Sequence, residues 1–228
     1  LDVATSFLAS AARLGFGMTV SHAARRPEKL LELYEFEGCP FCRKAREALS
    51  VFDLEAKVFP CPPGGTRYRP IVVGRGGKAQ FPYLVDPNTD AAMYESDAII
   101  RHLADTYGDG RVPLALRLGP LTAATASVAS LMRLSHGRSA RPSKLPEKAL
   151  ELYSFEASPY SRIAREALCE LELPYVLHNV AGGSQGREAF VARSGKMQVP
   201  WLHDPNTGTS MFESAEIVVY LRRTYGEG

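Results

Sequence analysis

The sequence predicts an α/β protein of two similar domains, each with the element order βαβ-ββα and each preceded by a helical segment. Three observations predict this class. Residues 27–54 and 146–173 match without a gap, and such a duplication indicates two copies of one unit. Within each copy the hydrophobic pattern alternates between strand and helix periods. A Cys-x-x-Cys motif, Cys39 to Cys42, marks the junction of the first strand and the first helix.

The repeat continues to the end of each copy, which sets the domain boundaries. The DPNT sequence at Asp86 recurs at Asp204, and the closing TYG at Thr106 recurs at Thr224. The chain therefore divides into a leading helix and link (1–26), a first domain (27–112), a linker helix (113–145) and a second domain (146–228).

Each element of the first domain follows from its hydrophobic period and its punctuating residues. Apolar runs predict strands over 31–36, 58–59, 83–85 and 92–94. Helical spacing of apolar residues predicts a helix over 43–52 and a last helix that opens at Ser96 and stops at Gly108. The stretch 60–78 is rich in Gly, Pro and Arg, so we expect at most a short helix near 68–73.

The two leading segments, residues 3–20 and 114–134, each present an apolar helical face. Neither is an evident transmembrane helix, because Arg13 and small residues interrupt the first segment, which is barely long enough to span. We expect both segments to pack against the domains or each other. Alternatively, residues 3–20 dock on a membrane surface or a protein complex.

Composition and charge limit the function classes. Hydrophobic residues make up 45% of the chain and charged residues 23%, which suits two ordinary domain cores. A net charge of +2, with basic residues scattered among acidic ones, gives no reason to expect a nucleic-acid partner. Four cysteines do not form a disulfide scaffold, so the sequence favours a reducing compartment.

The CPFC motif indicates thiol chemistry at Cys39. The free amides of Phe41 and Cys42 should point at its sulfur where the helix begins, and Arg43 follows within one turn. A helix terminus alone contributes about 0.3–1 kcal/mol, which is below one pKa unit. Hydrogen bonds and the Arg43 charge must supply the remainder. Cys42, three residues on, would be the resolving thiol, and Pro40 suits the first helical position.

Other interpretations of the cysteines remain open. Cys39 and Cys42 could be a vestigial or structural pair. A zinc site is not favoured because no second close pair or suitably spaced histidine is present, and an iron-sulfur cluster is not favoured either. Cys61 and Cys169 are expected to be unreactive, although the loop of Cys61 could lie beside the active site.

Three motifs in order, LYEFEGCPFCRKAREAL, QFP and ESDAII, carry a family resemblance. The sequence resembles the glutaredoxin-like, thioredoxin-fold N-terminal domain of glutathione transferases. As a whole it is most similar to tandem thioredoxin-fold proteins of plant and algal plastids, and its CPFC is similar to that of membrane-associated prostaglandin E synthase. The resemblance implies a chloroplast location, although no targeting peptide is visible. Neither domain is followed by the all-helical domain of glutathione transferases, which argues against conjugation.

The resemblance also implies a glutathione site in the first domain. By that pattern the tripeptide's cysteine contacts the backbone of Phe81 before a cis Pro82, and its γ-glutamyl end lies at Glu95 and Ser96. Arg69 and Lys78 are candidates for its glycine carboxylate. Alternatively, Ser96 merely caps its helix, and the two basic side chains are solvated.

The second domain replaces both cysteines with Ser158 and Ser161, and a hydroxyl cannot form a disulfide. It keeps the other motifs at Val199, Pro200, Glu213 and Ser214. Either Ser158 donates a hydrogen bond to a bound thiolate, as in serine-type transferases, or the second domain is purely structural.

These observations favour a glutathione-linked thiol-disulfide oxidoreductase of glutaredoxin type, or a glutathione transferase-like enzyme, acting through Cys39 and Cys42. Glutathione would be its co-substrate, protein thiols or disulfides its substrates, and no metal is expected. The alternative is a non-catalytic glutathione-binding or scaffold module for a plastid protein complex.

Overall fold

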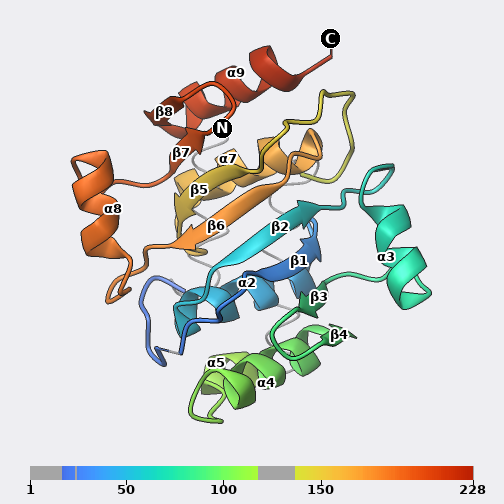
Figure 1. Ribbon diagram of the computed structural model, residues 1–228, viewed down its shortest axis with the longest axis vertical. Coiled ribbons are helices and arrows are strands. Elements are labelled where there is room, and N and C mark those ends of the chain that lie inside the picture. The colour runs from blue at the N-terminus through green and yellow to red at the C-terminus, as the bar shows by residue number, and fades with distance from the viewer. Residues whose placement is uncertain (1–16, 24, 118–136, 228) are drawn as a thin grey trace.

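The computed structural model describes residues 17–23, 25–117 and 137–227, and within them it confirms the predicted α/β class (Figure 1). The first domain contains β1 (Leu31–Glu35), α2 (Pro40–Phe52), β2 (Ala56–Pro60), α3 (Arg69–Gly76), β3 (Tyr83–Asp86), β4 (Ala91–Tyr94) and α4 (Ser96–Thr106), followed by the short α5 (Leu114–Arg117). The second contains β5 (Leu150–Ser154), α7 (Pro159–Glu170), β6 (Tyr175–Asn179), α8 (Arg187–Ser194), β7 (Trp201–Asp204), β8 (Thr209–Phe212) and α9 (Ser214–Tyr225). The order βαβ-ββα therefore occurs twice.

All eight of these strands belong to one sheet, in the order β4-β3-β1-β2-β6-β5-β7-β8. Within each domain the first two strands are parallel and the other pairings are antiparallel. The domains meet where β2 pairs with β6 in antiparallel register, with Lys57 opposite Val176. This pairing covers an edge strand of each domain, which would otherwise present unpaired backbone groups.

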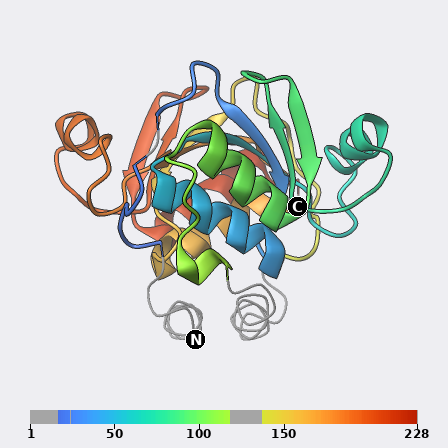
Figure 2. The same ribbon diagram turned by 90° about the horizontal axis from the view of Figure 1, so that it is seen from below.

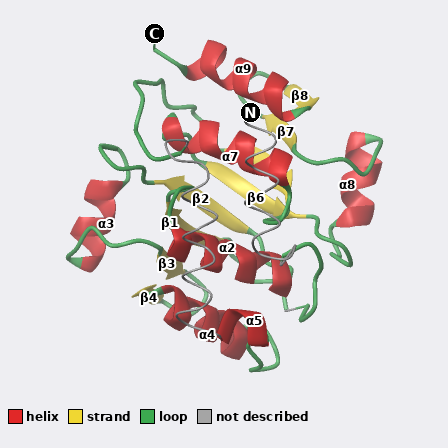
Figure 3. Ribbon diagram, turned by 180° about the vertical axis from the view of Figure 1, so that it is seen from behind, coloured by secondary structure: helices red, strands yellow, loops and turns green. Residues whose placement is uncertain are grey.

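Helices cover the sheet unequally on its two faces. α2 and α7 cross the centre of one face, with α4 and α9 outside them (Figure 3). α3 and α8 stand apart at the two flanks (Figure 2). α3 packs through Val72 against Tyr34 and Tyr83, whose side chains lie on the face opposite α2. The two helices that begin at Cys39 and Ser158, α2 and α7, therefore lie on the same face of the sheet.

The main hydrophobic core is continuous across both domains. Its fully buried members include Leu33 and Phe52 from the first domain and Leu152 and Leu168 from the second. Tyr175, on the joining strand β6, belongs to the same cluster. Because each fully buried large apolar side chain contributes roughly 1.5–3 kcal/mol, this shared core holds the two domains together as one unit.

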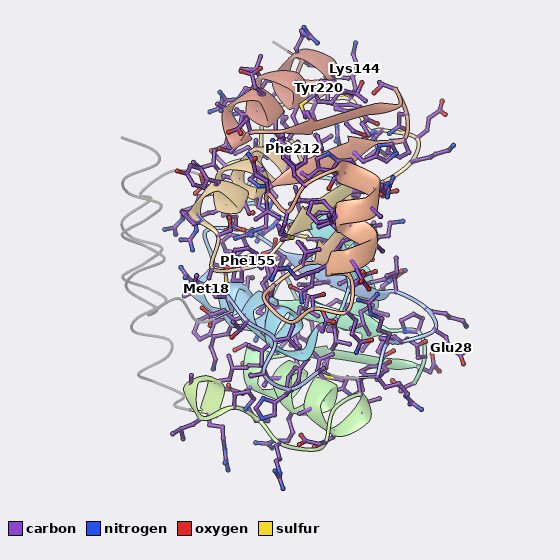
Figure 4. The ribbon with its side chains drawn as sticks, turned by 90° about the vertical axis from the view of Figure 1, so that its left-hand side faces the viewer. Met18, Glu28, Lys144, Phe155, Phe212 and Tyr220 are labelled. Carbon is purple, nitrogen blue, oxygen red and sulfur yellow. The ribbon has the colours of Figure 1, made fainter. Side chains whose placement is uncertain are left out.

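The described ends of the leading segments cross to the opposite domain. Val20 donates its amide to the carbonyl of Gly182 at 2.8 Å, and Gly182 donates back to Met18, labelled in Figure 4, at 2.8 Å. Likewise Ala140, from the segment before the second domain, donates to Pro63 of the first at 3.3 Å. Most of both predicted leading helices, residues 1–16 and 118–136, lies outside the described residues. Among the residues described, no helix is long and apolar enough to cross a membrane.

Candidate functional site

Cys39 lies at the start of α2, as the CPFC motif predicts. It is the N-cap residue, with extended backbone, and its Sγ accepts a hydrogen bond from the Cys42 amide at 3.3 Å. Pro40 follows in the first helical turn, where its missing N–H leaves no donor unpaired. The residue is 5% exposed, and its Sγ lies 4.0 Å from the carbonyl oxygen of Phe81. The free backbone amides at the start of α2 are thus directed toward the sulfur of Cys39.

These contacts separate the two thiols of the motif electrostatically. The hydrogen bond with the Cys42 side chain, aided by the backbone amides of Cys42 and Phe41, lowers the pKa of Cys39 despite its burial. Burial, and then the hydrogen bond with Cys39, raise the pKa of Cys42 well above its usual value. Cys39 therefore has the character of an attacking thiolate and Cys42 that of a thiol that stays protonated.

The other two cysteines are buried thiols far less suited to attack. Burial raises the pKa of both Cys61 and Cys169. All four cysteines of the chain are free, with no disulfide. The loop of Cys61 lies on the side of Phe81, which packs against the cluster that contains Cys61. Cys39 is thus the one thiol of the four whose pKa is lowered.

Arg43, expected to assist Cys39, points into the boundary between the domains. Its Nε lies 3.1 Å from Glu47 on the same helix and 3.9 Å from Glu156 of the second domain. The guanidinium is therefore balanced by carboxylates, and the Cys39 sulfur accepts hydrogen bonds from the backbone amides of Cys42 and Phe41. A direct role for Arg43 at the thiolate stays a prediction.

The proline motif and the Glu-Ser motif each have an unusual backbone geometry. The Phe81–Pro82 peptide bond is cis. Glu95 occupies the N-cap position of α4 with φ of 67°, a left-handed conformation uncommon outside glycine, and accepts a hydrogen bond from Gln80. Ser96 is the buried first residue of the helix, so the expectation that it caps α4 is wrong. The cap position belongs to Glu95, which makes no side-chain cap bond.

The two basic candidates lie in different surroundings. Arg69, at the start of α3, donates to the carbonyl of Cys61 at 2.8 Å, and its guanidinium lies 4.6 Å from the ring centre of Phe81. Lys78 instead lies over Tyr94, with Nζ 4.8 Å from the ring centre. Arg69 therefore lies beside Phe81, the residue predicted to contact the tripeptide, whereas Lys78 lies beside Tyr94 of β4.

The second domain repeats this geometry with oxygen in place of sulfur. Ser158 is the N-cap of α7, and its Oγ accepts a hydrogen bond from the Ser161 amide at 3.2 Å. The Val199–Pro200 bond is cis, and Glu213, at the N-cap of α9, has φ of 66°. Ser214 opens α9 as a buried residue. The second site thus keeps the backbone geometry of the first and has hydroxyls in place of its two thiols.

A cluster of buried ionic side chains joins the two sites, and the sequence analysis missed it. We call Glu35, Glu37, Arg46, Glu156 and Arg165 the interdomain ion cluster. Arg46 contacts Glu35, Glu37 at 3.2 Å and Glu156 at 3.0 Å. Arg165 contacts Glu37 and Glu156, each at 3.0 Å. Each arginine therefore binds a carboxylate of the opposite domain.

Folding shifts the pKa values of two carboxyls of this cluster in opposite directions. Burial raises the pKa of Glu35 to about 7, although Arg46 opposes the shift. Burial also acts on Glu156, but Arg165 and Arg46 outweigh it and lower that pKa to about 2. Glu35 is thus a carboxyl at the end of β1 that exchanges a proton near neutral pH.

Glu35 is also where the symmetry of the cluster fails. The repeat places Glu37 opposite Glu156 and Arg46 opposite Arg165, whereas Glu35 corresponds to Ser154. The signal was in the aligned sequences LYEFE and LYSFE, which differ at this position alone. The domain with cysteines has the extra carboxyl, and the domain with serines does not.

Within the described ranges, no group of three or more His, Cys, Asp or Glu side chains is arranged to hold a metal ion.

Comparison with known proteins shows the family. The sequence matches the glutathione S-transferase N-terminal domain twice, at residues 33–111 and 152–228. The chain therefore belongs to this family and contains two copies of its thioredoxin-like domain. No curated protein matches the sequence significantly.

A similar solved structure is a trimeric glutathione transferase of Leishmania, at 15% sequence identity and a TM-score of 0.31. The alignment covers 88% of this chain and 68% of that one. With so low a TM-score, we take no functional conclusion from this neighbour.

Proposed function

We propose that the first domain is a glutathione-linked thiol-disulfide oxidoreductase, with Cys39 as nucleophile and Cys42 as resolving thiol. One observation carries the proposal: of four thiols, Cys39 alone has a lowered pKa, and it lies at a helix start beside the carbonyl of Phe81. An inert structural pair has no need of this arrangement. Membership in the glutathione transferase N-terminal family supports glutathione as the co-substrate.

The reaction begins when the Cys39 thiolate attacks one sulfur of a substrate disulfide. A Cys39–sulfur bond forms, the substrate disulfide breaks, and the departing sulfur leaves as a thiolate that takes a proton from solvent. Cys42, three residues along the same helix, then attacks Cys39 and releases the second substrate sulfur. Two molecules of glutathione reduce the resulting Cys39–Cys42 disulfide and become oxidised glutathione.

The clamp around Cys39 supplies glutathione recognition in this proposal. The backbone of Phe81 would pair with the cysteinyl part of the tripeptide. The free amides at the start of α4, with Glu95 and Ser96, suit its γ-glutamyl end. Arg69, held beside Phe81, is better placed for the glycine carboxylate than Lys78.

Reduction of a small glutathione mixed disulfide, with glutathione as reductant, tests the proposal. Cys39→Ser should abolish turnover, whereas Cys42→Ser should retain deglutathionylation and lose reduction of dithiol-dependent substrates. Cys61→Ser is the matched control, because this thiol is buried with a raised pKa and should leave the rate unchanged. Equal loss in the Cys39 and Cys42 variants would contradict the assignment.

A second candidate function is a non-catalytic glutathione-binding or scaffold module. The near-complete burial of Cys39 and the serines of the second domain favour it. The pH dependence of Cys39 alkylation separates the two functions. An oxidoreductase requires alkylation to reach its plateau below the pH expected of an ordinary thiol, and a scaffold does not.

We further propose that the second domain is redox-inactive and that the protein acts in the plastid. The serines at 158 and 161 support the first statement, and the sequence resemblance supports the second. Fluorescent tagging of the protein as its own gene encodes it tests the location, and fluorescence confined to the cytosol would refute it.

A further inference from the structure

We propose that Glu172, in the second domain, is a positioning residue for the glutathione site of the first. Its carboxylate fixes the loop of residues 61–68, which leads into Arg69 beside the ring of Phe81. The inference rests on the proposed function and deepens it, because the domain without the CPFC thiols then takes part in binding glutathione to the domain that has them.

Glu172 holds the loop through two backbone amides. Its Oε2 accepts a hydrogen bond from the amide of Thr66 at 3.2 Å, and its Oε1 accepts one from the amide of Arg67 at 3.1 Å. Neither amide lies in a helix or strand, so each needs an acceptor of this kind. Glu172 itself is 5% exposed, and a buried carboxylate needs donors. The contact therefore satisfies both partners, and it crosses the domain boundary.

The side chain of Arg67 attaches the loop to the second domain a second time. Its Nη1 donates to the carbonyls of Leu171 at 3.3 Å and Glu172 at 3.4 Å, and its Nη2 donates to the carbonyl of Ser143. Gly65 permits this close approach, because a Cβ at that position would lie 2.6 Å from Oε1 of Glu172. The second domain therefore largely sets the conformation of residues 65–67.

The loop held in this way ends at the proposed glutathione site. Arg69, the first residue of α3, donates to the carbonyl of Cys61 at the other end of the loop at 2.8 Å, and its guanidinium lies 4.6 Å from the ring centre of Phe81. The carbonyl oxygen of Phe81 lies 4.0 Å from the Sγ of Cys39. A shift of residues 65–67 would therefore move the guanidinium that is proposed to bind the glycine carboxylate, and would leave the start of α2 in place.

The repeat makes the reciprocal contact. Asp53, in the first domain, corresponds to Glu172, and its Oδ2 accepts a hydrogen bond from the amide of Gln185, in the second, at 2.8 Å. Asp53 and Glu172 also share a left-handed backbone, with φ of 57° and 46°, which is uncommon outside glycine. Each domain therefore holds a loop of the other, and Asp53 provides a matched control for Glu172.

Only the loop held by Glu172 leads to an arginine beside an aromatic ring. In the second domain Val199 occupies the position of Phe81, and Arg187 occupies the position of Arg69. Arg187 donates instead to the Sδ of Met197 at 3.4 Å. The two interdomain contacts are therefore alike, but they differ in the side chains that they position.

Steady-state kinetics with glutathione report on the first site, because the second has serines in place of the thiols. Glu172→Gln keeps the length of the side chain and exchanges one accepting oxygen for an amide nitrogen, which cannot accept. With the loss of one hydrogen bond, the KM for glutathione should rise about threefold to tenfold. The kcat at saturating glutathione should stay within about twofold of the wild type, because the reacting thiols are unchanged.

A double-mutant cycle tests whether Glu172 acts through Arg69. Arg69→Ala should raise the KM for glutathione about tenfold or more, because hydrogen bonds to charged groups are stronger than neutral ones. The variant with both Glu172→Gln and Arg69→Ala should have the KM of Arg69→Ala alone, since the position of the loop no longer matters once the guanidinium is gone. Effects that multiply in the double variant would overturn the proposal.

Matched variants separate this role from structural damage. Asp53→Asn removes the carboxylate of the reciprocal contact, so it should lower Tm and leave the KM unchanged. If it raises the KM as much as Glu172→Gln does, the effect is general destabilisation and the proposal fails. Gly65→Ala presses a methyl group against the Glu172 carboxylate and should raise the KM even if Glu172→Gln does not fold. Its control is Gly74→Ala in α3, where an added Cβ meets no atom within 4 Å.

Protection of Cys39 from iodoacetamide by S-methylglutathione measures binding without turnover. In the absence of the ligand, wild type and Glu172→Gln should be alkylated at the same rate, because the contacts that lower the pKa of Cys39 come from Cys42 and Phe41. The ligand concentration that halves the rate should rise in Glu172→Gln by the same factor as the KM.

The protection measurement also separates this inference from the proposed function. Protection that weakens in Glu172→Gln, in a protein without glutathione-dependent turnover, would refute the oxidoreductase and support the role of Glu172. Turnover with the same KM and the same protection in both proteins would overturn this inference and leave the oxidoreductase in place. A wild-type protein that S-methylglutathione does not protect would refute the glutathione site and this inference with it.

Discussion

The thiol of Cys169, in the second domain, accepts a hydrogen bond from the backbone amide of Glu37, in the first, at 3.4 Å. The corresponding residues of the repeat make the reciprocal contact: the Ser50 hydroxyl, in the first domain, accepts a hydrogen bond from the backbone amide of Glu156, in the second, at 3.1 Å. Each first helix thus fixes the loop that precedes the other. Because these loops lead into the two candidate sites, the domain boundary and the sites share one framework.

Removal of one buried arginine should destabilise both domains together. Arg165→Ala removes the guanidinium that contacts the carboxylates of Glu37 and Glu156, each at 3.0 Å. Loss of one side of a buried ion pair typically costs about 3–5 kcal/mol. Urea unfolding followed by circular dichroism should show one transition at a lower midpoint. Arg193→Ala, which breaks an exposed pair with Glu151, should cost less than about 1 kcal/mol.

Stability should fall as the pH rises from 5 to 8 because of Glu35. Its folded-state pKa of about 7 lies above the ordinary 4.5, so the folded protein binds the proton more tightly than the unfolded chain. The associated stability is complete below the unfolded pKa and is lost as the pH rises through the folded one. At about 1.36 kcal/mol per unit, the change is no more than about 3 kcal/mol. The urea midpoint of Glu35→Gln should vary less with pH over this range than that of the wild type. An equal dependence on pH in the two proteins would contradict the raised pKa of Glu35.

Glu156 should act in the opposite direction at lower pH. Its folded-state pKa of about 2 lies below the ordinary value of 4.5, so its stability is present above the unfolded pKa and is lost as the pH falls. Glu156→Gln should therefore lose stability at pH 7 and show a shallower decline between about pH 5 and 2. Acid titration of the unfolding midpoint checks this, and a decline as steep as in the wild type would count against it.

Thiols placed in the second domain should react with glutathione. Ser158→Cys with Ser161→Cys, in a chain that also carries Cys39→Ser and Cys42→Ser, puts a sulfur where the Ser161 amide already donates a hydrogen bond. We expect a glutathione adduct at position 158, because the second domain keeps the helix start and the cis proline of the first. Mass spectrometry of samples treated with oxidised glutathione locates the adduct, and a chain that stays unmodified would argue against a glutathione site in this domain.

The leading segment of the first domain should stabilise the second. Val20→Pro removes the amide that donates to Gly182 at 2.8 Å, and deletion of residues 1–24 removes the bond to Met18 as well. At about 1 kcal/mol per hydrogen bond and roughly 2–4 °C per kcal/mol, loss of these two bonds alone should lower Tm by about 4–8 °C, and the deletion also removes the bonds from Ser21 and His22 to Val51. Met18→Ala, at a side chain that is 54% exposed, should change little. An unchanged Tm, with loss of membrane or partner binding, would instead make the segment an anchor.

The sequence by itself determined the local structure and its duplication. Hydrophobic periods predicted the βαβ-ββα order, because burial on one face of a strand or helix imposes that period. The CPFC motif placed Cys39 at the helix start, since capping and the proline position depend on adjacent residues. The cis bond before Pro82, implied by the family resemblance, is present in the structure.

The tertiary structure alone decided how the two domains meet and what surrounds the thiols. Any edge strand offers the same backbone groups, so no local pattern specified that β2 would pair with β6. That pairing brings α2 and α7 together, places Glu156 near Arg43, and buries the interdomain ion cluster. The proton affinity of Glu35 depends on desolvation and on charges from both domains, and these distances exist only once the chain has folded.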